Sequence, residues 1–211
     1  MSTLVILGAG GHAAVVAESA RRAGFLVAGI ASQVRPVDGG PFAGVPWLGD
    51  PDATGAIPSI EQLLHEGARL QAAVGDAVTR ARWLARFGEA AFISVVDPAA
   101  VVSVSATIGA GSFIGARAVV QARAAIGRAT IVNTAAIIEH DCIVGDCAHV
   151  SPGAILCGGV SLGAGTHVGA GAVVIPGRVV GANATIGAGA VVLRDVDAGV
   201  TAVGVPASAR A

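Results

Sequence analysis

The chain has 211 residues, which is enough for one large domain or for a small domain joined to a larger one. Its formal net charge of −1 gives no reason to expect nucleic acid or an anionic membrane as a partner. All 13 basic residues are arginine, and the lack of lysine excludes Schiff-base chemistry and a P-loop phosphate site.

Small aliphatic residues dominate the composition. Hydrophobic residues reach 54% of the chain although aromatic residues contribute only 3%, and there are 31 glycines. Such a composition suits thin, regularly stacked layers better than a bulky, irregular core. The three cysteines, Cys142, Cys147 and Cys157, form no CxxC pair. We therefore interpret them as reduced filler among apolar residues rather than as redox or metal-binding groups.

The N-terminal segment has no basic stretch before its first apolar run, and Glu18 and two arginines follow soon after that run. We therefore expect neither a signal peptide nor a membrane span. The protein is expected to be cytoplasmic.

Residues 1–95 alternate between strand patterns and helix patterns. We predict strands at 3–7, 25–31, 71–75 and 90–95. We predict helices from the loop after the first strand to about residue 23, at 60–66 and at 78–87. This alternation predicts a small α/β domain with a parallel sheet.

A glycine-rich loop, Gly8-Ala9-Gly10-Gly11-His12-Ala13, joins the first strand to the first helix. The loop fits the G-x-G-x-x-[GA] pattern of dinucleotide-binding folds. An NAD site also requires an acidic residue near the end of the second strand, and Ala31-Ser32 supplies none. We therefore interpret the loop as holding a phosphate or a sugar, with a purely structural turn as the alternative.

From Val96 onward an aliphatic residue occurs at every sixth position, for 17 hexads without an insertion, ending at Val192. A small residue usually stands four positions later. Glycine often follows the aliphatic residue directly, and we expect it to supply unusual backbone angles at a corner. This is the hexapeptide repeat of a parallel β-helix, in which 18 residues close one triangular coil. We predict a β-helix domain of five to six coils at residues 96–197 and a tail at 198–211.

Two histidines of the repeat, His140 and His149, occupy positions that cannot point into a coil, because one falls at a turn and the other at an outward strand position. A histidine that titrates near neutral pH can take the proton of an attacking amine or hydroxyl group. A carboxylate on its other ring nitrogen, such as Asp141, would fix the tautomer. A solvated surface histidine without a role is the alternative for each.

The glycine loop on a short α/β domain, the segment Ile138-Glu139-His140-Asp141-Cys142, His149, and the final Gly204-Val205-Pro206-Ala207 occur here in one chain. In this order they resemble the bacterial sugar acetyltransferases of the sialic acid O-acetyltransferase type, over essentially the whole chain. The chain is most similar to the N-acetyltransferases of nucleotide-linked 4-amino-sugars, such as bacillosamine and perosamine. The resemblance implies a left-handed β-helix, acetyl-CoA as co-substrate, no metal, and an amino-sugar acceptor. The hydroxyl of sialic acid or of another sugar is the alternative acceptor.

The resemblance also implies roles for individual residues. His140 would be the general base, and Asp141 the carboxylate that raises its basicity. The acetyl-CoA side would comprise His149 at the thioester, the Gly158 backbone N–H at the oxyanion, Ala170 and Ala188 along the CoA groove, and Arg194 and Arg210 at the CoA phosphates. The acceptor side would comprise Gly8, Gly10, Gly11, His12, Gly75 and Asn133.

The sequence departs from the family pattern at two places. Ala31-Ser32 stands where members that bind a uridine nucleotide carry a pair of acids, so we expect a base other than uracil, with a free or lipid-linked sugar as the alternative. Ser208 stands where a basic residue usually follows the Gly-Val-Pro-Ala stretch, which leaves arginines for the CoA phosphates. One further candidate, Arg178, takes the small-residue slot of its hexad. Because an unpaired guanidinium is costly among valines, we expect a bulge there that turns the side chain outward.

A flat β-helix face offers little concavity, whereas three prisms packed side by side create three grooves. We therefore expect a homotrimer with active sites at the interfaces, and neither nucleic acid nor a membrane as partner. His149 and His167 are one coil apart, about 4.8 Å by the strand spacing. They raise a zinc enzyme of the γ-carbonic-anhydrase type as a remote alternative, although the histidine pair five residues apart that such enzymes use is missing here. A non-catalytic β-helix scaffold is the other alternative.

Overall fold

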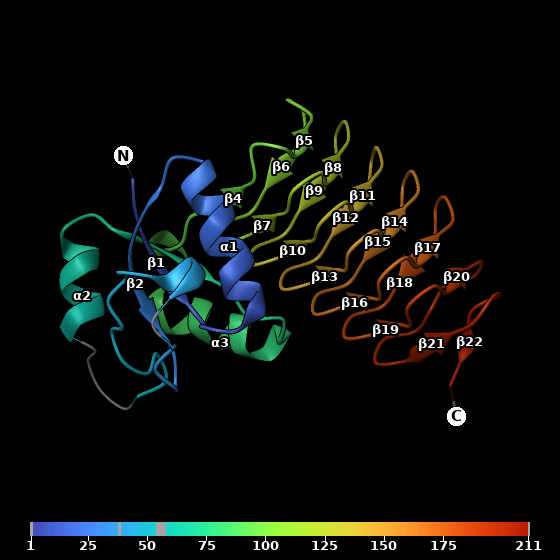
Figure 1. Cartoon of the computed structure of the whole chain (residues 1–211). Helices are drawn as coiled ribbons and strands as arrows, with labels where there is room; N and C mark the ends of the chain where they lie inside the picture. The colour runs from blue at the N-terminus through green and yellow to red at the C-terminus, as the bar shows by residue number, and fades with distance from the viewer. Residues whose placement is uncertain (1, 38, 54–57, 211) are drawn as a thin grey trace.

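The structure, a computed structural model, describes residues 2–37, 39–53 and 58–210. A small α/β domain leads into a prism of short strands, and the C-terminus lies at the far end of that prism (Figure 1). This confirms the predicted fold class, an α/β domain followed by a parallel β-helix. Among the described residues, no helix is both long enough and apolar enough to cross a membrane.

The first domain is built on a parallel sheet with the order β2-β1-β3, formed by β1 (Thr3–Leu7), β2 (Leu26–Ala31) and β3 (Arg69–Ala72). Alternate side chains of β1 point to opposite faces. Leu4 and Ile6 pack with helix α1 (Gly11–Arg22). Val5 and Leu7 pack with residues of α2 (Pro58–His65) and α3 (Ala77–Phe87). All four β1 side chains are fully buried, so helices cover both faces of the sheet.

Two predicted strands of this domain differ from the structure. The strand expected at 71–75 lies earlier, at Arg69–Ala72, because the chain then leaves the sheet to begin α3. The strand expected at 90–95 is wrong, because a 3₁₀ helix, η2 (Glu89–Ala91), occupies its start and only Phe92 bridges to β3. The other 3₁₀ helix in the described ranges is η1 (Gly40–Phe42).

Three parallel sheets form the sides of the prism, and we call them face I, face II and face III. Face I consists of β4 (Val95–Val96), β7 (Phe113–Ile114), β10 (Ile131–Val132), β13 (His149–Val150), β16 (His167–Val168), β19 (Thr185–Ile186) and β21 (Thr201–Val203), with β22 (Ser208–Ala209) antiparallel at its end. Face II consists of β5 (Val101–Val102), β8 (Val119–Val120), β11 (Ile137–Ile138), β14 (Ile155–Leu156), β17 (Val173–Val174) and β20 (Val191–Val192). Face III consists of β6 (Thr107–Ile108), β9 (Ala125–Ile126), β12 (Ile143–Val144), β15 (Ser161–Leu162) and β18 (Val179–Val180).

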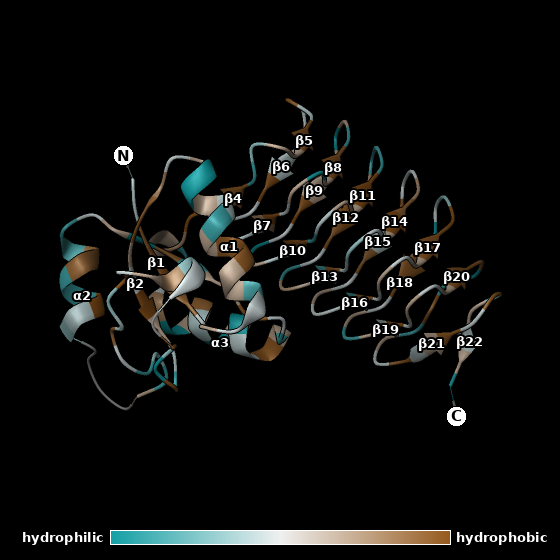
Figure 2. Cartoon of the chain, viewed as in Figure 1, coloured by the Kyte–Doolittle hydropathy of each residue, from teal (hydrophilic) through white to brown (hydrophobic). Residues whose placement is uncertain are grey.

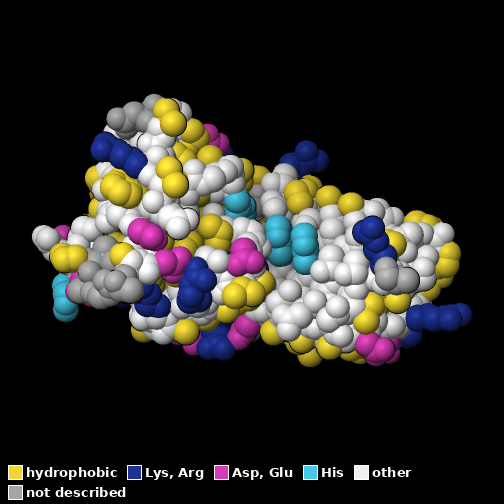
Figure 3. All heavy atoms as spheres, turned by 90° about the horizontal axis from the view of Figure 1, so that it is seen from below, with side chains coloured by type: hydrophobic (Ala, Val, Ile, Leu, Met, Phe, Trp, Pro, Cys, Tyr) yellow, Lys and Arg dark blue, Asp and Glu magenta, His cyan; other side chains and the backbone are white. Residues whose placement is uncertain are grey.

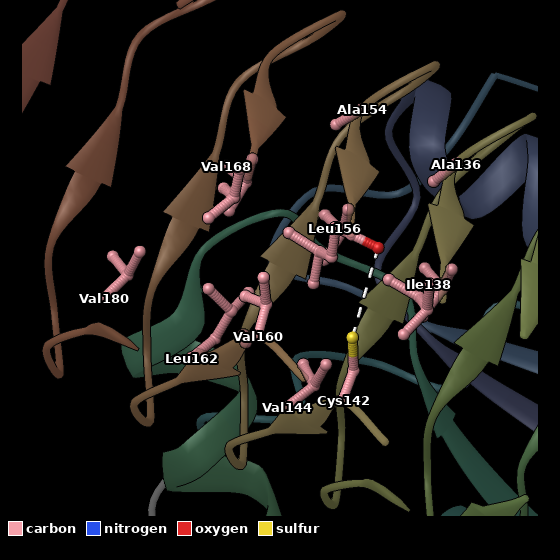
Figure 4. Close-up of a cluster of buried hydrophobic side chains, with 14 of the residues drawn as sticks. Ala136, Ile138, Cys142, Val144, Ala154, Leu156, Val160, Leu162, Val168 and Val180 are labelled. Carbon is pink, nitrogen blue, oxygen red and sulfur yellow. Dashed lines mark hydrogen bonds between the residues drawn. The ribbon is translucent and has the colours of Figure 1, made fainter. Parts of the chain in front are cut away.

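The aliphatic residues of the hexads fill the inside of the prism, as the repeat predicts. The second residue of each strand points inward, so that Val144, Leu156 and Val168 are almost fully buried in one continuous core. Brown, hydrophobic strands accordingly follow one another along the whole prism (Figure 2). Figure 4 shows the inner side chains of several coils pointing toward one another. Cys142 takes a small-residue slot among them, and the three cysteines are free thiols.

The glycine that directly follows an aliphatic residue has a different role from the one we expected. Gly145, for example, is not in the left-handed region; instead, a Cβ on it would lie 2.5 Å from the backbone nitrogen of Ala164 in the next coil. Glycine is needed there because successive coils approach closely. The left-handed angle occurs two residues later, at Cys147 in this hexad and at Asp141 in the hexad before, with φ of 56° and 60°.

The strand bulge predicted at Arg178 is absent from the structure. Strand β18 keeps its register with β15, pairing Ser161 with Val179 and Leu162 with Val180. Arg178 is half-buried and lies 3.6 Å from the carboxylate of Asp195. The guanidinium finds a partner at the end of the stack, and the strand does not have to distort.

A buried arginine joins the two parts of the chain. Arg80, on α3, has no exposed surface. Its Nε donates to Ala129 O at 2.8 Å, Nη1 donates to Gly75 O at 2.7 Å, and Nη2 donates to Ala148 O at 3.2 Å and to Cys147 O. Because these carbonyls belong to the β3–α3 loop and to two successive coils, one guanidinium fixes the first domain against the β-helix. Face I adds apolar contact, since Phe113 and Ile131 share a core with α1.

Replacing Arg80 tests this joint. Arg80→Met should lower the free energy of unfolding by about 3 kcal/mol, because it leaves buried carbonyls without donors. The melting temperature should then fall by roughly 6–12 °C for a chain of this size. Arg69→Met is the control, because that side chain is exposed and its one hydrogen bond within the described part of the chain is to the adjacent Ala68 carbonyl. Equal melting temperatures for the two variants would contradict the role given to Arg80.

Candidate active site

Three histidines meet where the first domain ends against face I. His12 begins α1, whereas His149 and His167 face outward from β13 and β16, whose pairing places them in register. The rings of His149 and His167 stack, with centroids 5.0 Å apart and an angle of 11° between their planes, and His12 lies 6.4 Å from His149. Histidine side chains accordingly gather in the middle of the molecule in Figure 3. We call these residues the histidine row.

Hydrogen bonds fix the orientation of His149. Asn133 Oδ1 accepts the backbone N–H of Thr134 at 2.8 Å, so the Asn133 amide group turns its Nδ2 toward His149 Nε2, at 3.1 Å. Since Nδ2 can only donate, Nε2 of His149 accepts, and the neutral ring carries its proton on Nδ1. His167 Nε2 lies 2.8 Å from the hydroxyl of Ser151. Sequence reasoning missed Ser151, although it precedes His167 by the same 16 residues that separate Asn133 from His149.

The histidine row is neutral at physiological pH. Burial lowers the pKa of His149 to about 3, with smaller contributions from His167, Arg80 and His12. Burial, together with the charge of Arg80, lowers the pKa of His12 to about 4 and also lowers the pKa of His167. The covering first domain excludes the interpretation of His149 as a freely solvated surface residue. Nε2 of His12 is buried and has no hydrogen-bond partner among the described residues.

The second group lies at the corner between faces II and III. His140 follows β11 and is exposed, and its Nδ1 lies 2.8 Å from Oδ2 of Asp141. A carboxylate only accepts, so Nδ1 carries the proton and Nε2 is left as the basic atom. Asp141 also accepts two hydrogen bonds from Arg123, one from Nε at 2.6 Å and one from Nη2 at 2.8 Å. These bonds to Arg123, and then to His140, hold the pKa of Asp141 well below its usual range, so the carboxylate stays ionised.

Sequence reasoning missed Arg123, although a signal for it exists. Arg123 precedes Asp141 by 18 residues, which is one coil. Both residues have a left-handed φ of 60° at equivalent corners, so their side chains leave adjacent coils side by side. An arginine one coil before Asp141 could therefore have been recognised as its partner from spacing alone.

Gly158 lies one coil beyond His140, directly beside its ring. A Cβ on Gly158 would come within 2.7 Å of His140 Nε2, so the absence of a side chain at Gly158 gives the imidazole its present position. Within the described residues, the backbone N–H of Gly158 donates no hydrogen bond, whereas its carbonyl accepts from Gly177. An unused N–H therefore lies next to the basic nitrogen of His140.

The structure does not bring His140 and the histidine row together within one chain. His140 and Asp141 lie at the corner of faces II and III, whereas His149 lies on face I and contacts Asn133, His12 and His167. Ala170 and Ala188 are exposed at a different corner, between faces I and II. The predicted site residues therefore form separate groups on one prism.

The remaining predicted residues lie in two places, beside the start of α1 and at the C-terminal end of the prism. Gly8 directly follows β1 with φ of 119°, and a Cβ on it would lie 2.8 Å from Ala73 O. Gly10, Gly11 and Gly75 have open space where a Cβ would be, beside the start of α1. At the other end of the prism, Arg194 lines a cavity of about 270 Å³ with the tail residues Ala207 and Ser208. Arg210 is exposed on the same tail.

No set of three or more His, Cys, Asp or Glu side chains in the described ranges is arranged to hold a metal ion. The Nε2 atoms of His149 and His167 are each within hydrogen-bond distance of another side chain.

Comparisons with known proteins agree with this architecture. Residues 3–87 match the family described as PglD N-terminal domain, and residues 159–194 match the bacterial transferase hexapeptide family (six repeats). No curated protein matches the chain.

Solved structures extend the similarity to the whole chain. PerB of Caulobacter crescentus, in complex with CoA and GDP-perosamine, is 38% identical, with a TM-score of 0.88 over 100% of this chain and 98% of that one. The acetyltransferase domain of PglB from Neisseria gonorrhoeae, in complex with acetyl coenzyme A, is 35% identical, with a TM-score of 0.85 over 99% and 98%. WeeI from Acinetobacter baumannii shares the fold at 22% identity, with a TM-score of 0.79 over 100% of both chains.

Taken with the coil architecture, these matches define an acyltransferase of the hexapeptide-repeat class. The chain belongs to the bacterial sugar acetyltransferases that carry a PglD-type N-terminal domain, and the resemblance drawn from its motifs is confirmed.

The buried, neutral state of His149 predicts how stability depends on pH. The unfolded chain protonates this ring near its ordinary pKa of about 6.5, whereas the folded chain does so only near pH 3. Between these values the unfolded state binds the extra proton, so stability is fully present above about pH 6.5 and falls as the pH drops. Denaturant unfolding at pH 7 and pH 5 should show this loss.

His149→Gln should make that pH dependence shallower, because one proton fewer is taken up on unfolding. His65→Gln is the control, since His65 is exposed on α2. If His149→Gln and the parent lose stability in parallel from pH 7 to pH 5, His149 is not held neutral.

Proposed function

We propose that the protein transfers the acetyl group of acetyl-CoA to the amino group of a nucleotide-linked amino-sugar. The observation that carries the proposal is the pair formed by His140 and Asp141, with a basic Nε2 beside the unused N–H of Gly158. The relatives support the substrates: the Caulobacter enzyme binds CoA and GDP-perosamine, and the Neisseria domain binds acetyl coenzyme A. The former is an N-acetyltransferase, which favours an amine over a hydroxyl acceptor.

His140 acts as the general base in this proposal. The amine lone pair attacks the thioester carbonyl, Nε2 of His140 takes the amine proton, and the carbon–sulfur bond breaks. The proton then passes to the departing CoA sulfur, which leaves an amide and free CoA thiol. Asp141 remains ionised throughout, so it favours the imidazolium that forms during attack. Direct attack of this kind requires no acyl-enzyme.

The acetyl-CoA groove runs along the prism. The Gly158 N–H stabilises the oxyanion that develops on the thioester carbonyl. Ala170 and Ala188 line the pantetheine with their backbone, and small side chains at these exposed corners allow a close approach. Arg194 and Arg210 at the far end meet the CoA phosphates.

The acceptor lies against the first domain. Gly8, Gly10 and Gly11 open the start of α1 to the sugar diphosphate, since the first N–H groups of a helix attract anions. Gly75 leaves further space at the same edge. The sugar then meets His12, Asn133 and His149, and the two histidines stay neutral, so they place no positive charge beside the amino group. In this division, residues 1–95 bind the acceptor, 96–197 bind acetyl-CoA, and 198–211 complete the CoA site.

A trimer unites the separate groups. The outward residues of face II are all aliphatic: Val101, Val119, Ile137, Ile155, Val173 and Val191. The corners that flank this face carry His140 with Gly158 on one side and Ala170 with Ala188 on the other. If face II lies toward a threefold axis, each of these corners faces the opposite corner of a neighbouring copy. One active site then draws residues from two chains.

The general base is tested by His140→Asn, which keeps a donor for Asp141 and removes the basic Nε2. It should lower kcat by at least about 10²-fold with little effect on acetyl-CoA binding. Release of CoA thiol, with a GDP-linked 4-amino-sugar as acceptor, measures kcat, and calorimetry measures the binding. His65→Asn, on the exposed surface of α2, is the control. A kcat within a few-fold of the parent would sink the assignment.

The assembly is tested with two matched variants, Ile137→Glu on face II and Ile143→Glu on face III. Both side chains point outward, so neither substitution disturbs the core of the coil. Light scattering should report a trimer of the 20.4 kDa chain for the parent and for Ile143→Glu, and a monomer with little activity for Ile137→Glu. A fully active Ile137→Glu monomer would show that the site does not need a second copy.

A further inference from the structure

A cavity outside the groups described so far opens at the carboxyl ends of the sheet in the first domain. Its volume is about 300 Å³, and its walls include Gly8 after β1, Ser32 after β2, Asp50, and Arg82 and Trp83 of α3. Because the sheet order is β2-β1-β3, the chain winds to one side of β1 and then to the other. Such a switch point, at the carboxyl ends of parallel strands, is where open α/β sheets bind ligands.

One carboxylate in this cavity is already occupied. Asp52 accepts hydrogen bonds from Nε and Nη2 of Arg82, at 3.0 and 2.6 Å. It also accepts one from the indole N–H of Trp83, at 2.8 Å. These bonds, Arg82 first among them, lower the pKa of Asp52 despite an opposing contribution from burial. Asp52 therefore fixes the loop to α3 and has little capacity left for a ligand.

The other carboxylate, Asp50, is available. Its Oδ1 accepts the backbone N–H of Asp52 at 2.9 Å, which orients the group. Asp50 forms no ion pair with any residue that the structure describes, and Arg82 is already held by Asp52. Asp50 is partly exposed and lines the cavity, and its Oδ2 and the second lone pair of Oδ1 can still accept hydrogen bonds from a ligand.

The negative charge of Asp50 limits which part of a nucleotide-linked sugar can bind in this cavity. It repels a diphosphate, which instead belongs at the start of α1, beside Gly10 and Gly11. The carboxylate matches two adjacent donors on one edge of a ring, since its two oxygens can accept in parallel. Guanine presents such an edge, with N1–H beside the 2-amino group, whereas uracil presents one N–H between two carbonyl groups.

We infer that Asp50 is the residue that selects guanine as the base of the nucleotide-linked sugar. The inference rests on the proposed function and deepens it, because it names the nucleotide class through the chemistry of one side chain. It also accounts for Ala31-Ser32 at the end of β2, where no acid is needed if the base is recognised from Asp50. The GDP-perosamine complex of the 38% identical Caulobacter enzyme agrees with a guanine nucleotide.

The competing role for Asp50 is acceptance of hydrogen bonds from the ribose hydroxyls, as acids do in many dinucleotide sites. The two roles give different nucleotide profiles. A base-reading carboxylate discriminates GDP from inosine diphosphate, which lacks only the 2-amino group. A ribose-reading carboxylate discriminates GDP from its 2′-deoxy form and treats all bases alike.

The test is calorimetric titration of the full-length protein with GDP, inosine diphosphate, xanthosine diphosphate, UDP and 2′-deoxy-GDP. The parent should bind GDP at least about tenfold more tightly than inosine diphosphate, because the missing amino group leaves one carboxylate oxygen unpaired. Asp50→Asn should lose about 10- to 100-fold in GDP affinity. It should also gain affinity for xanthosine diphosphate, because the amide can donate to the 2-oxo group while accepting from N1–H.

Glu18→Gln, an exposed carboxylate change on α1, is the control, and an unchanged melting temperature shows that each variant is folded. Equal binding of GDP and inosine diphosphate by the parent would overturn the inference, as would an equal loss for all five nucleotides in Asp50→Asn. Acetyl transfer is measured separately. If the nucleotide profile holds but no GDP-linked amino-sugar is acetylated, the proposed function fails while the role of Asp50 stands.

Discussion

The candidate site depends on one geometric constraint, the unbroken 18-residue coil. Because every coil has the same length, a residue lies directly above its counterpart one coil earlier, at the spacing of hydrogen-bonded strands. Three contacts of the candidate site join residues that are one coil apart. The rings of His149 and His167 stack, Arg123 donates hydrogen bonds to Asp141, and His140 lies beside Gly158. A single inserted residue would separate each of these pairs, because strand side chains change face with every position.

The same scaffold produces two opposite electrostatic environments. On face I the first domain partly buries His12 and His149, and the buried charge of Arg80 opposes protonation there. At the corner of faces II and III, Asp141 stays ionised between Arg123 and His140, in contact with solvent. One chain of similar repeats therefore carries both a row of histidines that are held neutral and, at another corner, an exposed histidine that is hydrogen-bonded to an ionised carboxylate.

The repeat made the β-helix predictable, because a period of six residues leaves no other regular fold that buries every aliphatic position. The adjacency of His140 and Asp141 could also be read directly from the sequence. The glycines after the aliphatic positions were misinterpreted, because close approach between coils cannot be distinguished from a positive φ in a single sequence. The strand expected at 90–95 failed because the chain leaves the sheet at Phe92 to enter the first coil. Asp50 was missed because its availability depends on Arg82 being held by Asp52, which is 30 residues away.

The buried guanidinium of Arg80 has a consequence for motion. A joint that ties one loop to two coils through several hydrogen bonds resists hinge rotation of the first domain against the prism. The separation between the cavity at the sheet edge and the histidine row is then a fixed length. For the proposed acceptor, this fixed length sets which linkage between base and amine brings the nitrogen to the thioester, so acceptors with a shorter or longer linkage should react poorly.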